Sequence, residues 1–366
     1  MNKDTIVFDD ILKIYNDEIR KRVKNKKRIN EFEKYKITYL TNIYNTLKED
    51  KYAPHKYNIF LIRYPKYRII MSQSIYDKII NHFVSKYILE PKLTKYLDIR
   101  NTATRKNMGS SYAINLLNKY IEINKRKYTN FYILKIDLSK YFYSIDHQVL
   151  KQLLKDKLND YEYHLIEVMI DSTNHNYVND TIIKLKEKEL EKKHKAKEIN
   201  KLPLYEQGKG LAIGMMTNQI LAIFYLYKLH NYIIHKLHLK YMVIYMDDYV
   251  IIHHDKEYLK YCLSKIKDIL NTEYKLQINK NKTKITSSKE GFIFLQYKYK
   301  IINGKTIIKL RRSSLNNIKN NIKNNNKQYQ EGKITYNKLF SSINNYANSN
   351  KYDKIKVSRI IDKYLG

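Results

Sequence analysis

Cysteine and long apolar runs are the first things that this sequence lacks. Cys262 is the single cysteine among 366 residues, which excludes disulfides within the chain and cysteine-rich zinc modules, and fits a reducing, cytoplasmic setting. Met1 to Asp10 contain no apolar segment of signal-peptide length. No apolar run approaches the roughly 18 residues of a spanning helix, so we expect no membrane segment.

Acidic residues are scarce as well. The chain has 36 Asp and Glu against 70 Lys and Arg, and its formal charge is +34. This excess favours a polyanionic partner, because each phosphate that a cation neutralises releases bound counterions. An AT-rich codon bias is the alternative, and it explains Lys in place of Arg but not the excess of bases over acids. The 37 Tyr and 10 Phe suit base stacking, although we assign most of these rings to the core or surface.

The order of predicted elements indicates an α+β protein. Residues 5–50 predict two amphipathic helices, and residues 58–73 predict a basic β-hairpin around Pro65. Ser74 fits the N-cap of the helix that follows. Short apolar strands and helices then alternate, and the chain from Arg311 onward is basic and helical in pattern. We therefore predict an antiparallel sheet with helices on one face.

Two segments are predicted without assigned chemistry. Residues 184–201, dominated by Lys and Glu, predict a solvated insertion. Residues 291–310 predict two strands joined at Asn303 and Gly304.

Two adjacent acids interrupt apolar strands and point to a metal site. Asp247 and Asp248 stand between the apolar runs MVIY and YVII, where an uncompensated carboxylate costs several kcal/mol. A tight turn is the alternative, yet neither Gly nor Asn accompanies them. Asp137 ends the apolar run FYILKI in the same way. Carboxylates on neighbouring strands suit two Mg²⁺ ions about 4 Å apart, the arrangement used for phosphoryl transfer.

His253, His254 and Asp255 follow the second strand and offer another metal-like pattern. We interpret them as polar surface at a strand exit.

The motifs around the three acids resemble those of reverse transcriptases. YMDD at residues 245–248 resembles the catalytic signature of that family, and LKIDLSKYFYSIDH around Asp137 resembles its first palm motif. GKGLAIGMMTNQILAIFYL resembles the palm motif between them, while LQINKNKTKI and FIFLQYKY resemble the motifs after the hairpin. PKYRIIMSQSIYDKIINHFVSKYILEP resembles the fingers of bacterial members. The likeness covers roughly residues 58–345, with the motifs in the family's order.

This resemblance implies a right-hand polymerase that makes DNA on RNA. It implies two Mg²⁺ ions, with Mn²⁺ as an alternative, held by Asp137, Asp247 and Asp248 together with the carbonyl of Leu138. The implied parts are an N-terminal helical extension (residues 1–57), fingers (58–130), a palm (131–300) and a thumb (301–366). We expect no RNase H, maturase or endonuclease domain.

The resemblance also assigns residues to substrates. Phe142 resembles the steric gate that excludes a ribose 2′-hydroxyl, with a core aromatic as the alternative. Arg68 resembles a residue that clasps the triphosphate, as does Lys66, for which a solvated charge is the alternative. Gly214 would allow a close backbone approach. The implied nucleotide-binding set is Lys66, Arg68, Phe142, Ile213, Gly214, Gln219 and Lys282. The implied primer- and template-binding set is Tyr245, Arg105, Arg311 and Arg312.

Details of the palm motif indicate a lineage within the family. The enzymes of diversity-generating retroelements carry Ser-Gln where this chain has Asn218 and Gln219. Ile213 stands where retroviral enzymes use a Gln near the nucleotide, which leads to a hypothesis of low fidelity. Ala212 and Gln296 depart from the Pro and Gly of most relatives.

The implied partners are an RNA template, a DNA or RNA primer, and dNTPs. An accessory protein and a dedicated non-coding RNA would join them in a diversity-generating system. A phage-defence reverse transcriptase is the alternative role. A palm that binds nucleic acid without catalysis and an RNA-dependent RNA polymerase are further alternatives, against which the intact acids and the bulky Phe142 argue.

Overall fold

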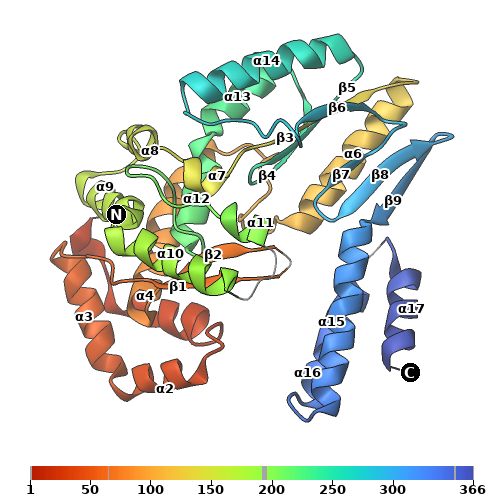
Figure 1. Ribbon diagram of the computed structural model, residues 1–366. Helices are drawn as coiled ribbons and strands as arrows, with labels where there is room; N and C mark the ends of the chain where they lie inside the picture. The colour runs from red at the N-terminus through yellow and green to blue at the C-terminus, as the bar shows by residue number, and fades with distance from the viewer. Residues whose placement is uncertain (1, 65, 192–195, 350–351, 366) are drawn as a thin grey trace.

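The computed structural model describes residues 2–64, 66–191, 196–349 and 352–365. Pro65, expected within the hairpin, and residues 192–195 of the expected insertion lie outside these ranges. Figure 1 shows a palm sheet with its helices at the top, fingers with the N-terminal helices at the lower left, and thumb helices at the lower right. The mixture of helices and antiparallel sheets confirms the α+β expectation and has the plan of a right-hand polymerase.

The palm is built on a four-stranded antiparallel sheet. Its strands, in the order in which they pair, are β4 (Tyr241–Tyr245), β5 (Asp248–His253), β3 (Tyr132–Asp137) and β6 (Lys284–Ser287). Side chains alternate between the faces of a strand. Leu134 and Ile251 are therefore buried on one face, while Ile133 and Val250 are buried on the other.

Because both faces of this sheet are apolar, both are covered, whereas the sequence predicted helices on one face only. The helices that share a core with the first face include α12 (Met216–Tyr225), α13 (Tyr227–His235) and α14 (Lys256–Thr272). The second face packs on α6 (Ser110–Lys127) and on a three-stranded sheet of β7 (Phe292–Phe294), β8 (Tyr297–Ile302) and β9 (Lys305–Leu310).

The three-stranded sheet corrects and confirms parts of the prediction for residues 291–310. Three strands form here instead of two, because Phe292–Phe294 pairs with β8 as a separate short strand. Asn303 and Gly304 join β8 to β9 as predicted, both with positive φ (47° and 71°), which suits a two-residue hairpin turn.

The fingers carry the β1–β2 hairpin, which extends toward the thumb in Figure 1. Strand β1 (Asn58–Ile62) pairs with β2 (Arg68–Ser72), and α4 (Ile75–Val84) follows. The Ser74 hydroxyl accepts a hydrogen bond from the Asp77 amide at 3.0 Å, so Ser74 is the N-cap that the sequence predicted.

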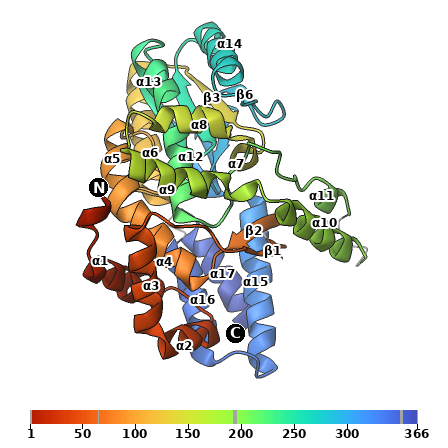
Figure 2. The ribbon, with the colours of Figure 1, turned by 90° about the vertical axis from the view of Figure 1, so that its left-hand side faces the viewer.

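The N-terminal helices pack against α4 in the same core as the palm (Figure 2). The second helix expected within residues 5–50 is split at Tyr35, whose φ of −124° is not helical. The helical segments of this region are α1 (Phe8–Lys13), the π-helical turn η2 (Ile14–Ile19), α2 (Lys26–Lys34) and α3 (Lys36–Lys48).

The charged insertion forms helices that contact the fingers. Its described part belongs to α10 (Asn176–Leu190) and α11 (Ala196–Asn200). Glu189 is 5% exposed, and its carboxylate pairs with the Arg63 guanidinium at 2.7 Å. The insertion is therefore not wholly solvated, contrary to the prediction, because it holds the end of β1 through this ion pair.

The thumb comprises α15 (Arg312–Gln330), α16 (Tyr336–Ser349) and α17 (Lys354–Leu365). The remaining short helices are η1 (Lys3–Thr5), η3 (Ser85–Leu89), α5 (Glu90–Leu93), η4 (Thr94–Tyr96), α7 (Tyr141–Ser144), α8 (His147–Leu154), α9 (Asp160–Ile170) and η5 (Asp171–Thr173). Within the described ranges, no helix is both long and apolar enough to cross a bilayer.

Candidate active site

A tight turn presents Asp247 at the end of the palm sheet. Tyr245 and Asp248 pair across β4 and β5, so Met246 and Asp247 alone form the turn between them. Met246 has a φ of +56°, a conformation that costs a non-glycine residue of order 1–3 kcal/mol. The flanking strands impose this strained turn, and the turn places Asp247 at the end of the sheet.

Strand pairing brings Asp137 to the same end of the sheet. Asp137 is the last residue of β3 and lies directly opposite Asp248 on β5. The amide of the next residue, Leu138, donates to the Asp247 carbonyl at 3.3 Å. The four predicted metal-site residues are therefore neighbours at one end of two strands.

Lys282 lies against the carboxylate of Asp137. Its ammonium group lies 2.9 and 3.0 Å from the two carboxylate oxygens of Asp137. The Thr283 hydroxyl also accepts from the Asp137 amide at 3.3 Å. Lys282, which the resemblance placed near the nucleotide phosphates, thus contacts a predicted metal ligand directly.

Burial disfavours negative charge on both acids of the hairpin. Burial raises the pKa of Asp247, and the nearby Asp137 carboxylate adds to this, whereas Lys282 and Arg68 act in the opposite direction. Burial likewise raises the pKa of Asp248 to about 6, against the opposing effect of Lys135. A nearby cation therefore stabilises the charged form of each of these carboxylates.

Only some of the three carboxylates are arranged as ligands of a divalent cation. Asp248 Oδ1 is buried without a hydrogen bond, although Lys135 Nζ lies 3.3 Å away as an ion-pair partner. No cluster of three or more His, Cys, Asp or Glu side chains in the described ranges has the spacing of a metal site. Asp137 and Asp247 remain suitable oxygen ligands for Mg²⁺, while Asp248 is directed toward Lys135.

A cavity of about 540 Å³ adjoins Asp247 between the palm and the fingers. Its volume suits a nucleotide-sized ligand. Five residues of the predicted nucleotide set line it: Arg68, Phe142, Ile213, Gly214 and Gln219. Its lining does not include Lys66, which is exposed in the hairpin loop, or Lys282, which lies on Asp137.

The backbone around Phe142 directs its ring to this cavity. Lys140 adopts a left-handed conformation with φ +48° and ends the extended segment after β3. The Phe142 carbonyl then accepts from the Leu211 amide at 2.7 Å. Phe142 packs edge-on against the buried ring of Tyr141, with centroids 6.0 Å apart. These contacts fix the position of a bulky ring beside Asp247.

Gly214 allows a close backbone approach, as expected, but the approach is to strand β2 and not to a nucleotide. Its φ is +123°, and a Cβ there would lie 3.0 Å from the Met71 carbonyl oxygen. The Met71 amide donates to the Ile213 carbonyl at 3.0 Å. The close approach at Gly214 is therefore to strand β2, and it joins the palm loop to the fingers.

The predicted primer and template residues lie outside the cavity lining. Tyr245 ends β4 opposite Asp248, and Arg311 and Arg312 are exposed where α15 begins. Arg105 is turned inward, since its Nη1 donates to the carbonyls of Asp98 and Asn101 at 2.7 and 2.9 Å. Arg105 therefore braces its own loop.

No pattern in the sequence indicated Asn81, a buried residue of α4 that positions α12. Its Oδ1 accepts from the amides of Met216 and Thr217 at 3.0 and 3.2 Å, and its Nδ2 donates to the Thr217 hydroxyl at 2.7 Å. These amides belong to the first turn of α12, which has no intrahelical acceptors for them. Gln219 follows on the same turn and reaches the cavity.

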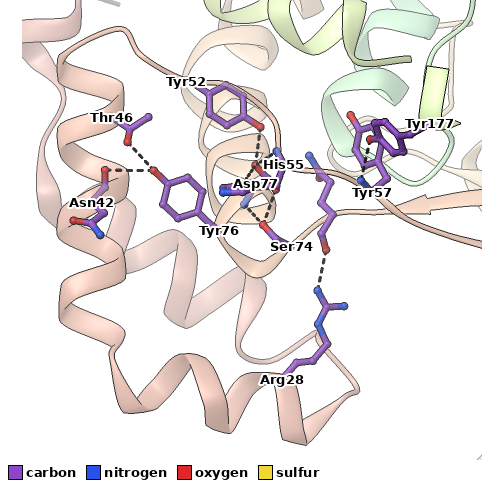
Figure 3. A network of polar contacts seen from close by, with 11 residues as sticks. Arg28, Asn42, Thr46, Tyr52, His55, Tyr57, Ser74, Tyr76, Asp77 and Tyr177 are labelled. Atoms are coloured by element: carbon purple, nitrogen blue, oxygen red, sulfur yellow. Dashed lines mark hydrogen bonds and ion pairs between the residues drawn. The ribbon is translucent and has the colours of Figure 1, made fainter. Parts of the chain in front are cut away.

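Asp77 was also missed, and it anchors the chain that enters the fingers (Figure 3). Its buried carboxylate accepts from the hydroxyls of Ser74 and Tyr52 at 2.6 and 3.2 Å, and lies 3.1 Å from the His55 ring nitrogen. Only the Ser74 contact has a local signal, because Ser74 and Asp77 stand at N-cap spacing.

Comparison with known proteins gives a family match. Residues 48–299 match the family model described as "Reverse transcriptase (RNA-dependent DNA polymerase)". The search of curated proteins found no match.

Among solved structures, the chain is similar to telomerases of two Candida species. A C-terminally truncated apo telomerase from Candida tropicalis is 14% identical, with a TM-score of 0.48 over 70% of this chain and 55% of that one. Telomerase from Candida albicans with a fragment of telomeric RNA is 14% identical, with a TM-score of 0.46 over 90% and 63%. Apo telomerase from Candida tropicalis is 16% identical, with a TM-score of 0.47 over 86% and 57%. The chain thus spans between 55% and 63% of the length of these three telomerase chains.

Proposed function

The chain belongs to the reverse transcriptase (RNA-dependent DNA polymerase) family, and from this membership we propose that it copies RNA into DNA. One observation carries the proposal: Asp137 and Asp247 lie at the same end of the palm sheet, and Asp247 lines a cavity of about 540 Å³ together with Arg68 and Phe142. Phosphoryl transfer requires positioning and charge neutralisation more than covalent chemistry. This geometry provides groups for both.

The residues divide the work of nucleotide addition between them. Asp137 and Asp247 would hold Mg²⁺, with the Leu138 carbonyl beside them and Asp248 supporting the hairpin. When bound, the metal would lower the pKa of the primer hydroxyl and neutralise charge on the phosphates. Arg68 binds the triphosphate through its planar guanidinium, and Phe142 occupies the space of a 2′-hydroxyl.

Lys282 adds a second cation next to the acids. Its ammonium group neutralises Asp137 in the structure. In this proposal Lys282 would leave Asp137 when that carboxylate holds metal, and would then contact the departing pyrophosphate. Tyr245, at the base of the catalytic turn, contacts the primer end in this proposal, and Arg311 and Arg312 hold the duplex backbone.

For the biological role, we favour a diversity-generating retroelement. The segment IGMMTNQ supports this choice, because it resembles the palm motif of the diversity-generating enzymes; its residues Ile213 and Gln219 line the cavity. The partners would be a template RNA and an accessory protein. Sequencing the RNA that co-purifies with the protein separates this role from phage defence: a repeat-derived template supports it, and an unrelated structured RNA contradicts it.

RNA-templated primer extension tests the activity itself. The purified protein receives Mg²⁺, a primed RNA of defined sequence and all four dNTPs, or three of them. We expect DNA complementary to the template that stops at the position of the omitted nucleotide. Nucleic acid that is bound but never extended, on RNA and DNA templates alike, would show a binding platform instead of a polymerase.

A further inference from the structure

A second candidate site lies at the opposite end of the palm sheet from the acids. Strand β3 begins at Tyr132, paired with His253, and ends at Asp137, so the two ends are about 17 Å apart at the usual rise per residue. At the Tyr132 end, the last turn of α6 and the β8–β9 turn lie near each other (Figure 1, upper right). They enclose a cavity of about 730 Å³, which is a volume that accommodates a nucleotide.

The cavity is basic. Lys125, Lys289 and Lys300 line it, together with Tyr128, and no carboxylate does. Lys125 is neutralised by Glu122 at 2.9 Å, but Lys289 and Lys300 form no ion pair within the described part of the chain. The wall of the cavity therefore carries uncompensated positive charge.

The exposed face of the three-stranded sheet extends this charge. Lys298, Lys300 and Ile302 alternate outward along β8, and Lys298 lies directly opposite Lys309 on β9. Like charges in that position repel each other and destabilise a sheet. Neither lysine has a carboxylate partner among the residues that the structure describes, so a bound polyanion is the group that would relieve the repulsion.

Aromatic rings lead to the same cavity. The Tyr128 ring stacks on His254 with centroids 4.4 Å apart and an interplanar angle of 9°, and His254 lies 4.4 Å from His253. The series continues to Tyr258 at 5.0 Å. Asp255 does not join these histidines around a metal, because its carboxylate caps α14 at the Tyr258 amide.

We propose that this distal palm surface, formed by Tyr128, Lys289, Lys298, Lys300 and Lys309, binds a nucleic-acid strand outside the catalytic cleft. Phosphates lie along the lysines and one base stacks at Tyr128, a combination typical of single-strand binding. The lysines of this surface would repel a basic accessory protein. The site is separate from the proposed polymerase reaction, and its test requires no synthesis.

Salt-dependent binding tests the phosphate contacts. The full-length protein is first saturated with an unlabelled hairpin primer–template, and the anisotropy of a labelled single-stranded RNA is then followed from low to moderate salt. The test variant carries Lys289→Gln, Lys298→Gln and Lys300→Gln. The control carries Lys155→Gln, Lys228→Gln and Lys236→Gln, which removes as many exposed lysines from α8, α13 and their ends.

We expect the test variant alone to reduce the slope of log K against log salt by about 2, which corresponds to roughly 0.7 per phosphate contact on a single strand. Equal slopes for the two variants would overturn the proposal, because net charge alone would then explain binding. Labelled DNA and free nucleoside triphosphates, measured in the same way, distinguish an RNA strand from other sources of the same chemistry.

The ring is tested by Tyr128→Ala and Tyr128→Phe, with the melting temperature of each variant measured in parallel. We expect RNA binding to weaken about tenfold in the alanine variant and to stay within about twofold in the phenylalanine variant. Ultraviolet crosslinking of the wild type should join RNA to peptides containing Tyr128. Crosslinks confined to the fingers and to the Asp247 hairpin would contradict the proposed surface.

Discussion

Phe142 is the residue with the most specific proposed role. Phe142 lines the cavity beside Asp247; its backbone carbonyl accepts a hydrogen bond from the Leu211 amide, and its ring packs against the ring of Tyr141. Replacement by Ala removes the bulk that excludes a 2′-hydroxyl. We expect the preference for dCTP over CTP, measured as a ratio of kcat/KM, to fall by at least about tenfold.

The matched control is Phe142→Tyr, which keeps the ring and should keep the preference. Sugar selectivity that is unchanged in Phe142→Ala would assign Phe142 to the core and place the gate elsewhere.

Ile213 tests the hypothesis of low fidelity. Ile213 lines the cavity, and its contact to the fingers is made by its backbone carbonyl, which accepts from the Met71 amide, so a side-chain substitution leaves that contact in place. In Ile213→Gln we expect at least about twofold fewer errors per nucleotide in sequenced cDNA. A polar side chain that forms hydrogen bonds with a correctly paired nucleotide discriminates against a mispaired one more strongly than an apolar side chain does. An error rate equal to that of the wild type counts against the hypothesis.

For single residues, the sequence indicated those acids whose position follows from the end of a strand. It did not indicate contacts between residues that only the tertiary fold brings together. Asp137 and Asp247 each end an apolar run, and antiparallel pairing brings such ends together. Lys282 stands 145 residues from Asp137, and no local pattern predicts the ion pair between them. The family resemblance placed Arg105 on the primer or template, yet its guanidinium donates to the carbonyls of its own loop.

Among the elements, α12 depends on a residue from another helix. Asn81 of α4 satisfies two amides of its first turn. Asn81→Ala leaves these buried groups without partners, and we expect a loss of about 1–3 kcal/mol in the free energy of unfolding. Urea denaturation measures this loss.

Asn81→Asp is the matched variant, because its carboxylate keeps the acceptor at a helix N-terminus. It should lose less stability than the alanine variant. Equal stability of Asn81→Ala and the wild type would show that water replaces the cap.

Long periodic elements were predictable from the sequence, and short or capped ones were not. The helix after Ser74 has both a cap signal and regular apolar spacing, and it forms as α4. Phe292–Phe294 has three residues, which are too few to show a period, so the third strand of its sheet was missed. The break at Tyr35 has no Pro or Gly to signal it.

Across the whole molecule, the cores do not follow the expected divisions of the chain. Ile11 and Leu40 of the N-terminal extension share a core with Phe83 of the fingers and Ile136 of the palm. Strand β8 crosses the expected palm–thumb boundary at residue 300, and we propose a boundary at Leu310, where the helices begin. Composition does not reveal such divisions, because they depend on strand pairing.

The thumb provides a prediction at this scale. Arg311 and Arg312 are exposed at the start of α15, a helix that extends downward from the three-stranded sheet in Figure 1. A double variant, Arg311→Gln with Arg312→Gln, should weaken primer–template binding. We expect its salt slope to fall by about 2, or roughly 0.9 per phosphate contact on a duplex. A Lys155→Gln, Lys228→Gln variant controls for net charge, and an identical change in both would remove the thumb from the binding surface.

The central claim is that Asp137 and Asp247 hold the metal for DNA synthesis, and Asp247→Asn in a primer-extension assay tests it most directly. The amide has the shape of the carboxylate, and burial already disfavours the charge of Asp247, so the variant should melt at or above the wild-type temperature. We predict that it binds primer–template normally but extends it at least about a thousandfold more slowly in Mg²⁺. Extension at the wild-type rate by this folded variant would contradict the assignment of the active site.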